Sequence, residues 1–158
     1  MRINFTNIGW IDLTCTSVDE LIEIMSENDV SDLHIDDWES EATTEIAESL
    51  GLLAVSYVSN EEVEALIEVC EALEKEDADM ILAFDEAVGG YSDIHSLIRN
   101  ANSAFWGEFE SHAEFGFHYA QETTTIPEEF ENYIDWHSYA DDLLMDFAEA
   151  NGYYFLPV

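Results

Sequence analysis

Five histidines and two cysteines are the residues of this 158-residue chain that could bind a transition metal or act as nucleophiles. His112 and His118 are spaced as i and i+6, which places them on different faces of a helix, and the sequence has no HExxH motif. Cys15 and Cys70 lie far apart, without CxxC spacing and without a third cysteine. We therefore expect no metal site and no cofactor, and we expect both cysteines to be buried free thiols.

The 37 aspartates and glutamates could supply acid and base pairs or calcium ligands, but their number makes any single pair uninformative. A calcium-binding loop needs a fixed series of oxygen ligands around a central glycine, and the sequence contains no such series. It also contains no GxSxG motif and no glycine-rich phosphate-binding loop. We therefore expect no catalytic residues and no enzymatic activity.

The charge balance is extreme, because 37 acidic residues face three basic ones and leave a net charge of −34. Hydrophobic residues still make up 47% and aromatic residues 13% of the chain, so we expect it to fold. Self-repulsion at this level keeps a protein soluble and excludes nucleic acid and anionic membranes as partners. Since no apolar stretch is long enough to span a membrane, we expect a cytoplasmic protein with a basic partner.

Short strands and capped helices must position these charges in the first third of the chain. Alternating apolar and polar residues predict two strands joined by a turn over 2–15, and a further strand over 32–38. A helix is expected over 17–28, because a serine followed three residues later by a glutamate forms a capping box. A shorter helix is expected over 43–51, where a glycine ends it.

The clearest helix signal begins at a second capping box, Ser59 with Glu62. Five apolar residues share one stripe of this helix: Val63, Leu66, Ile67, Cys70 and Leu73. Four acidic residues share another side: Glu61, Glu64, Glu68 and Glu71. Like charges at these spacings repel by about 0.2–0.5 kcal/mol per pair, and Lys75 supplies the one opposite charge at helical spacing.

Further helices are expected in the second half of the chain. An apolar helix over 80–88 should be followed by a double-glycine turn and by a helix capped by Ser92. A third capping box, Ser111 with Glu114, predicts the next helix. The tail over 153–158 is typical of a closing strand.

Asp135 is expected to cap one more helix, which continues to residue 147. Its apolar face comprises Trp136, Tyr139, Ala140, Leu143 and Phe147. Its other face carries Asp135, Asp142, Asp146 and Glu149. Aromatic residues at helical spacing usually belong to a core, and a self-association surface is the alternative.

Together these elements predict an α+β fold made of small helix-and-short-sheet units with a strongly acidic surface. We expect one chain with three subdomains, an N-terminal one over 1–58, a central helical one over 59–102 and a C-terminal one over 103–158.

The excess of negative charge is comparable with that of a DNA duplex. Duplex DNA carries about one negative charge per 1.7 Å of axis, so 34 net charges correspond to about 17 base pairs. Carboxylates along rigid helices could replace phosphates in a DNA-binding groove, because such a groove docks on the backbone before it reads bases. The carboxylates expected to form this surface are Glu61, Glu64, Glu68, Glu71, Glu108, Glu110, Glu114, Glu122, Glu128, Glu129, Glu131, Asp135, Asp141, Asp142, Asp146 and Glu149.

Two stretches of the C-terminal half resemble the ArdA-type antirestriction proteins. The first reads GEFES over 107–111, and the second reads YIDWHSYADDL over 133–143. The resemblance implies an elongated homodimer that mimics bent B-form DNA and blocks the DNA-binding groove of a type I restriction–modification complex. Such a protein would protect phage or plasmid DNA as it enters a bacterial host cell.

Other readings of the acidity stay open. The mimic could act on a CRISPR effector, another phage-defence complex or a nucleoid protein. An acidic chaperone of a basic protein would also fit the charge, and it would form a one-to-one complex without affecting DNA cleavage. Adaptation to high salt would explain the acidic residues but not the aromatic ones.

Overall fold

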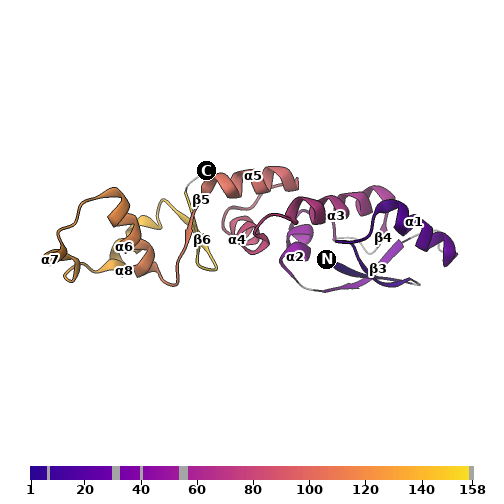
Figure 1. Cartoon of the computed structure of the whole chain (residues 1–158), viewed down its shortest axis with the longest axis horizontal. Helices are drawn as coiled ribbons and strands as arrows, with labels where there is room; N and C mark the ends of the chain where they lie inside the picture. The colour runs from indigo at the N-terminus through magenta and orange to yellow at the C-terminus, as the bar shows by residue number, and fades with distance from the viewer. Residues whose placement is uncertain (7, 30–32, 40, 54–56, 157–158) are drawn as a thin grey trace.

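The molecule is elongated, with helix α1 (Val18–Glu27) near one end and helix α7 (Glu128–Glu131) at the other (Figure 1). This computed structural model describes residues 1–6, 8–29, 33–39, 41–53 and 57–156. Helices alternate with two antiparallel sheets along the long axis, so the predicted α+β class is confirmed. Within the described ranges, every helix is too short or too polar to cross a membrane.

A four-stranded antiparallel sheet forms the N-terminal part, with its strands in the order β2-β1-β3-β4. The strands are β1 (Arg2–Phe5), β2 (Gly9–Asp12), β3 (Leu33–Trp38) and β4 (Tyr57–Val58). Ile3 and Phe5 are buried while their neighbours are not, because successive side chains of a strand point to opposite faces. Leu33 and Ile35 repeat this pattern in β3. The predicted strands are confirmed, although residue 32 lies outside the described part of the chain.

Three helices accompany this sheet: α1, α2 (Ala42–Ser49) and α3 (Asn60–Leu73). Both predicted capping boxes are present at the starts of α1 and α3. The five apolar residues predicted to share one stripe of α3 are all buried. The short helix α2 ends next to Gly51, as predicted, and the φ of +81° at Gly51 is a conformation that glycine adopts without strain.

Helices α4 (Ala78–Val88) and α5 (Ile94–Ala104) occupy the middle of the molecule (Figure 1). The cap of α5 is Asp93, whose carboxylate accepts a hydrogen bond from the Ser96 amide at 2.8 Å. The prediction of Ser92 as the cap is therefore wrong. The helix begins at Ile94, so the residue directly before it takes the capping position, and a carboxylate there also interacts favourably with the helix dipole.

The C-terminal part places helices α6 (His112–Thr123) and α8 (Trp136–Leu143) beside a three-stranded antiparallel sheet in the order β5-β7-β6. Its strands are β5 (Phe105–Glu108), β6 (Ala148–Ala150) and β7 (Tyr153–Phe155). Asn151 and Gly152 join β6 to β7 with φ values of +54° and +85°. Two positive φ values at an Asn-Gly pair are typical of the tight hairpin turn that matches the twist of the strands.

The helix predicted from Asp135 to residue 147 ends earlier, at Leu143. The amides of Leu144 and Asp146 turn back to the carbonyls of Ala140 and Leu143, which closes the helix. The following residues are needed for β6, whose register the Asn-Gly turn sets. The predicted closing strand is confirmed over Tyr153–Phe155, and residues 157–158 lie outside the described part of the chain.

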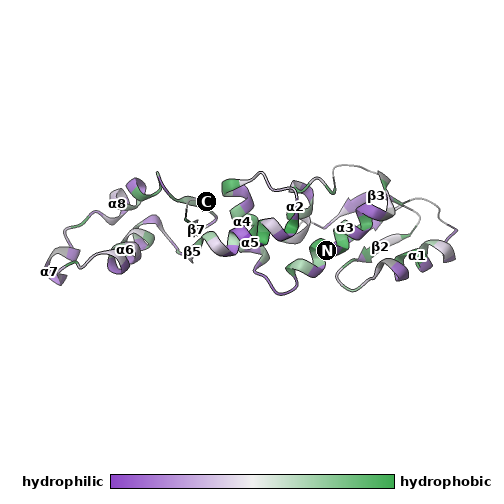
Figure 2. Ribbon diagram, turned by 90° about the horizontal axis from the view of Figure 1, so that it is seen from above, coloured by the Kyte–Doolittle hydropathy of each residue, from purple (hydrophilic) through white to green (hydrophobic). Residues whose placement is uncertain are grey.

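Two clusters of buried residues hold the molecule together. The large core joins the N-terminal sheet to α1 through α5 and is mostly aliphatic. Hydrophobic residues recur along these elements (green in Figure 2). The small core consists of Phe115, Ala140 and Tyr154, with further aromatic residues packed around them. Strand β7 serves both, because Tyr154 enters the small core while its neighbour Phe155 points to the large core.

The two cysteines differ. Cys70 is buried in the large core, and this burial raises the pKa of its thiol to about 11. Cys15 is exposed in the turn after β2, so the prediction of a buried thiol is correct for Cys70 and wrong for Cys15.

Candidate functional site

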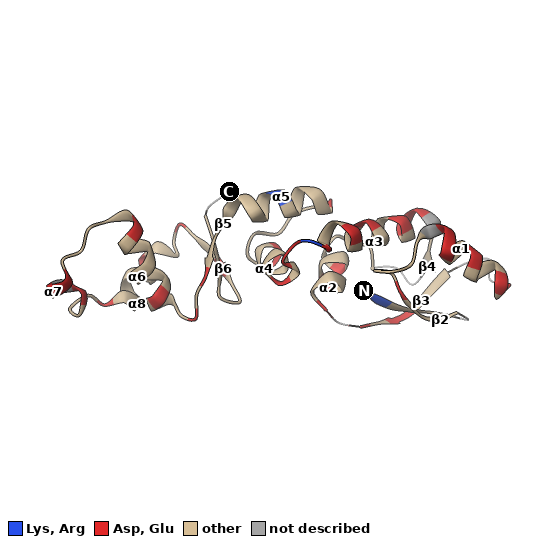
Figure 3. Ribbon diagram, in the orientation of Figure 1, with Lys and Arg blue, Asp and Glu red and all other residues tan. Residues whose placement is uncertain are grey.

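The predicted carboxylates of α3 line the solvent side of this helix (Figure 3). Glu61, Glu64, Glu68 and Glu71 are all exposed. They extend over ten residues, or about 15 Å of helix, which is about one charge per 5 Å. One strand of DNA carries a charge about every 3.4 Å. The row on α3 is therefore comparable in density with the phosphates of a single strand.

Two other glutamates, Glu20 and Glu62, take part in the capping boxes at the starts of α1 and α3. The Ser59 amide donates a hydrogen bond to Glu62 Oε2 at 2.7 Å, and the Glu62 amide donates to Ser59 Oγ at 3.3 Å. The hydrogen bonds from the backbone and side chain of Ser59 lower the pKa of Glu62 below its ordinary value. Ser17 lowers the pKa of Glu20 in the same way at the start of α1. Both carboxylates are therefore negatively charged while they cap their helices.

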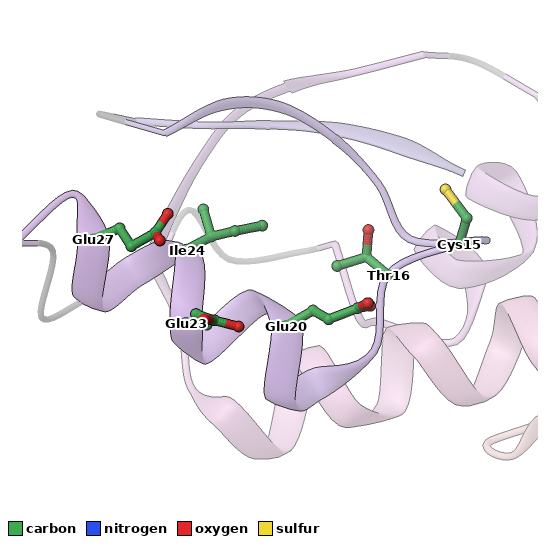
Figure 4. A pocket seen from close by; sticks show the side chains of 6 residues that line it. All are labelled: Cys15, Thr16, Glu20, Glu23, Ile24 and Glu27. Atoms are coloured by element: carbon green, nitrogen blue, oxygen red, sulfur yellow. The ribbon is translucent and has the colours of Figure 1, made fainter.

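Helix α1 extends the acidic surface beyond the predicted set. Glu20, Glu23 and Glu27 line an open hollow of about 440 Å³ together with Cys15, Thr16 and Ile24 (Figure 4). These glutamates recur at the three- and four-residue spacings that place side chains on one helix face, so the sequence carried the signal for them. Since α1 packs against α3, the two rows of carboxylates belong to neighbouring helices.

Three predicted carboxylates meet around a second hollow in the C-terminal part. Glu108, Glu110 and Glu114 line a space of about 450 Å³ next to the β6–β7 turn. Glu114 Oε2 accepts a hydrogen bond from the Glu110 amide at 2.9 Å, while the Glu114 amide donates to Ser111 Oγ at 3.2 Å. The predicted capping box is thus half correct, because Ser111 caps the helix but Glu114 returns to the residue before it.

The far end of the molecule carries four more predicted carboxylates (Figure 3). Glu122 lies near the end of α6, and Glu128, Glu129 and Glu131 lie on α7. Glu131 is half-buried and the other three are exposed. The Glu131 carbonyl accepts a hydrogen bond from Trp136 Nε1 at 3.1 Å, which ties α7 to the start of α8.

On α8, Asp135, Asp141 and Asp142 are exposed as predicted. Asp135 caps the helix, and the hydrogen bonds from the Ser138 amide and hydroxyl lower its pKa. The prediction that Asp146 and Glu149 share this helix face is wrong, because the helix ends at Leu143. Asp146 is exposed in the turn that follows.

Glu149 lies half-buried in β6, where its Oε1 accepts a hydrogen bond from the Gly152 amide at 3.1 Å. Its carboxylate supports the hairpin and is less available to a partner than the exposed ones. The Asn-Gly pair at 151–152 was the sequence signal for this hairpin.

The acidity is not uniform over the surface. Residues 94–107, which include all of α5, contain no aspartate or glutamate (Figure 3). Arg99 lies on this helix and donates a hydrogen bond to Ser96 Oγ at 3.1 Å. The molecule therefore has an acid-free segment at its middle, with acidic helices on both sides along the axis.

Histidines form pairs with two of the predicted carboxylates. His95 Nε2 lies 3.0 Å from Glu68 Oε1. His112 Nδ1 and His137 Nδ1 each lie 3.4 Å from Asp141 Oδ1. Helix α8 thereby places His137 beside His112.

One family model, described as Antirestriction protein (ArdA), matches residues 9–155 of the chain. No curated protein and no solved structure matches it.

Proposed function

Since this chain belongs to the antirestriction protein (ArdA) family, we propose that it inhibits a type I restriction–modification complex by occupying the groove in which that complex binds DNA. The carrying observation is the family match together with the unpaired charge of the surface. Three lysine and arginine residues can neutralise few of 37 carboxylates, and 14 of the 16 predicted surface carboxylates are exposed.

The geometry supports charge mimicry. A groove that binds DNA presents lysine and arginine to two phosphate strands. The elongated shape distributes the carboxylates of α1, α3, α6, α7 and α8 along one long molecule (Figure 3). Helices hold their side chains at fixed spacings, so the charges are positioned before binding and little order has to be created on contact.

Binding would proceed through electrostatic steps. The net charge of −34 attracts a basic groove over a distance of about one Debye length, near 10 Å at moderate salt. Each exposed pair then contributes only about 0.2–1 kcal/mol, so affinity depends on many carboxylates acting together. DNA is excluded because its phosphates need the same lysines and arginines. No chemical step takes place.

We also propose that the protein acts as a homodimer in the cytoplasm of a bacterial cell. Phe105 and Leu156 are both partly exposed at one end of the β5–β7 pair, where the Leu156 amide donates to the Ala104 carbonyl at 2.8 Å. A second copy covering these apolar side chains would add its own acidic surface to that of the first. Light scattering after size-exclusion chromatography would give twice the mass of the chain, and a monomer at working concentrations would contradict this part of the proposal.

The test is a DNA cleavage assay with a type I restriction–modification complex at two salt concentrations. We expect inhibition that weakens steeply as salt rises and that excess duplex substrate DNA relieves. Inhibition insensitive to both salt and competing DNA would contradict the proposal. A complex that forms without any effect on cleavage would favour the acidic chaperone instead.

The contribution of α3 can be separated from that of any single residue. Replacing Glu61, Glu64, Glu68 and Glu71 together by glutamine should weaken inhibition about 30-fold, because four exposed pairs at about 0.5 kcal/mol each contribute about 2 kcal/mol. The matched control is Glu64→Gln alone, for which we expect less than a fivefold change. Complete loss from the single change would indicate a localised hot spot rather than distributed charge.

A further inference from the structure

Three side chains from two helices converge beside the small core. His112 comes from the first turn of α6, and His137 and Asp141 come from α8 at i and i+4. One possible ligand atom from each residue lies within 4.8 Å of the other two. The side chains are 37%, 68% and 58% exposed in that order, so solvent and ions can reach all three.

Close packing of α6 against α8 creates this cluster. Gly116 faces α8, and a Cβ atom at this position would lie 2.8 Å from the Trp136 carbonyl oxygen and 3.1 Å from the Ala140 Cβ. Because glycine lets the two helices approach, the first turn of α6 reaches His137. The His112 and His137 rings are 5.7 Å apart, and the His112 ring also makes an edge contact with the buried Tyr154 at 6.2 Å.

We propose that His112, His137 and Asp141 form a binding site for a divalent transition-metal ion of the zinc class. A tetrahedral zinc site has bonds of about 2.0–2.2 Å to nitrogen and oxygen, which puts its ligand atoms about 3.3–3.6 Å apart. Both histidine Nδ1 atoms lie 3.4 Å from Asp141 Oδ1, so two edges of such a tetrahedron are already formed. The remaining pair of ligand atoms lies within 4.8 Å, and rotation of the imidazoles would have to bring this pair to the same distance.

The donor set selects the ion. Magnesium and calcium prefer oxygen ligands, and the many carboxylates of this surface offer those everywhere. Two imidazole nitrogens with one carboxylate suit zinc, cobalt, nickel and copper instead. Three protein ligands fill three of the four positions of a tetrahedral site. The fourth position remains for water or for a ligand from a partner. This site goes beyond the proposed antirestriction function and does not depend on it.

The ion would act as a clamp between α6 and α8. It would join the first turn of α6 to the middle of α8 at the edge of the small core, which has few buried side chains. It would also offset two negative charges at the contact between α6 and α8. Metal binding to the folded state then stabilises this part of the molecule by mass action.

The test uses the full-length protein and Co²⁺, whose visible absorption bands become intense in tetrahedral coordination, in the presence of excess Mg²⁺. Magnesium occupies the oxygen sites, so we expect one equivalent of Co²⁺ to produce intense bands and Zn²⁺ to displace it. His137→Gln and Asp141→Ala each should lower the Co²⁺ affinity by at least about tenfold. Zn²⁺ should raise the unfolding temperature of the unmodified protein and leave that of His137→Gln unchanged.

His95→Gln is the matched control. His95 is 65% exposed and also pairs with a carboxylate, Glu68, but it belongs to no three-residue ligand group among the residues that the structure describes. We expect this variant to bind Co²⁺ as the unmodified protein does. Absence of the bands in the unmodified protein, or bands that persist unchanged in both His137→Gln and Asp141→Ala, would overturn the proposal. Circular dichroism of each variant without metal shows whether it is folded. The DNA cleavage assay is a separate measurement, so failure of the metal site and failure of the proposed inhibition can be told apart.

Discussion

The two cores of this molecule offset the repulsion between surface carboxylates in different ways. The large core buries aliphatic residues from a four-stranded sheet and five helices, so many side chains share the burial. Among the described residues, the small core fully buries Phe115, Ala140 and Tyr154, and its other members are half-buried aromatic residues together with Leu143 and Leu144. Both must offset repulsion between carboxylates that have no basic partners nearby.

The small core depends on rings. The Phe115 and Tyr154 rings stack with centroids 4.2 Å apart, and Phe147 meets Phe115 edge-on at 5.2 Å. Aromatic side chains bury about 150–250 Å² each, so a few of them can hold two helices on a sheet. The comparison teaches that a small acidic unit can fold on few residues if these are large, but each of them then becomes indispensable.

The largest expected effect separates the two cores by one matched pair of substitutions. Phe115→Ala and Phe84→Ala each remove a fully buried ring and should cost about 3–5 kcal/mol. We expect Phe115→Ala to expose the amides of α6 and α8 to hydrogen exchange while α3 stays protected. Phe84→Ala, in the large core, should reduce the protection of the α3 amides. If Phe115→Ala weakened the protection of α3 equally, the two cores would unfold as one unit.

A smaller effect is expected where α6 meets α8. Alanine is normally preferred over glycine in a helix by about 1 kcal/mol, but at Gly116 its Cβ would collide with the Trp136 carbonyl. We therefore expect Gly116→Ala to destabilise the C-terminal part by about 1–3 kcal/mol, measured by urea unfolding. Gln121→Ala on the exposed side of α6 is the control and should change stability by less than about 0.5 kcal/mol. A stabilising Gly116→Ala would show that the helices are not held this closely.

The helix caps should give a smaller difference between the two regions. Ser59→Ala removes one half of a complete capping box on α3 and should cost about 1 kcal/mol. Ser111→Ala on α6 should cost a similar amount, but the carboxylate of Glu114 keeps its bond to the Glu110 amide. Amide exchange should rise in the first turn of α3 for one variant and of α6 for the other. Loss of both helices from either change would contradict separate cores.

The smallest effect concerns pH at the cap of α8. Hydrogen bonds from the Ser138 amide and hydroxyl lower the pKa of Asp135, so its contribution to stability is present above the unfolded value, near 3.8. This contribution is lost as pH falls through the lower folded pKa. Ser138→Ala removes the hydroxyl and should raise the pKa of Asp135 toward 3.8, measured by NMR titration of the carboxyl carbon. Ser96→Ala should do the same to Asp93 on α5, and an unchanged pKa in both would contradict the role of the hydroxyls.

Much of the fold follows from neighbours in the chain. The capping boxes at Ser17 and Ser59 were predictable because the cap and its glutamate are three residues apart. The alternation in β1 and the apolar stripe of α3 were predictable for the same reason, since period two and period 3.6 are local properties. The α8 helix was predicted too long, because its apolar spacing continued to Phe147 while the Asn-Gly turn required a strand directly afterwards.

The exposure of the candidate surface carboxylates was likewise predictable only in part. Exposure of the α3 carboxylates could be predicted, since the buried stripe of the helix determines which side faces water. The burial of Glu149 could not, because it depends on a hydrogen bond to the turn of a hairpin. The acid-free stretch over 94–107 is visible in the sequence, but its place at the middle of the molecule is a property of the fold (Figure 3).

The sequence by itself determined the sign and excess of charge, the starts of most helices and the faces they bury, because each of these depends on residue type and on neighbours within one or two turns. Only the tertiary structure decided that β7 divides its side chains between two cores, that Gly116 lets α6 approach α8, and that His112 meets His137 and Asp141. These contacts join residues far apart in the chain. They depend on strand order and on helix packing at distances of a few ångströms, which local spacing does not encode.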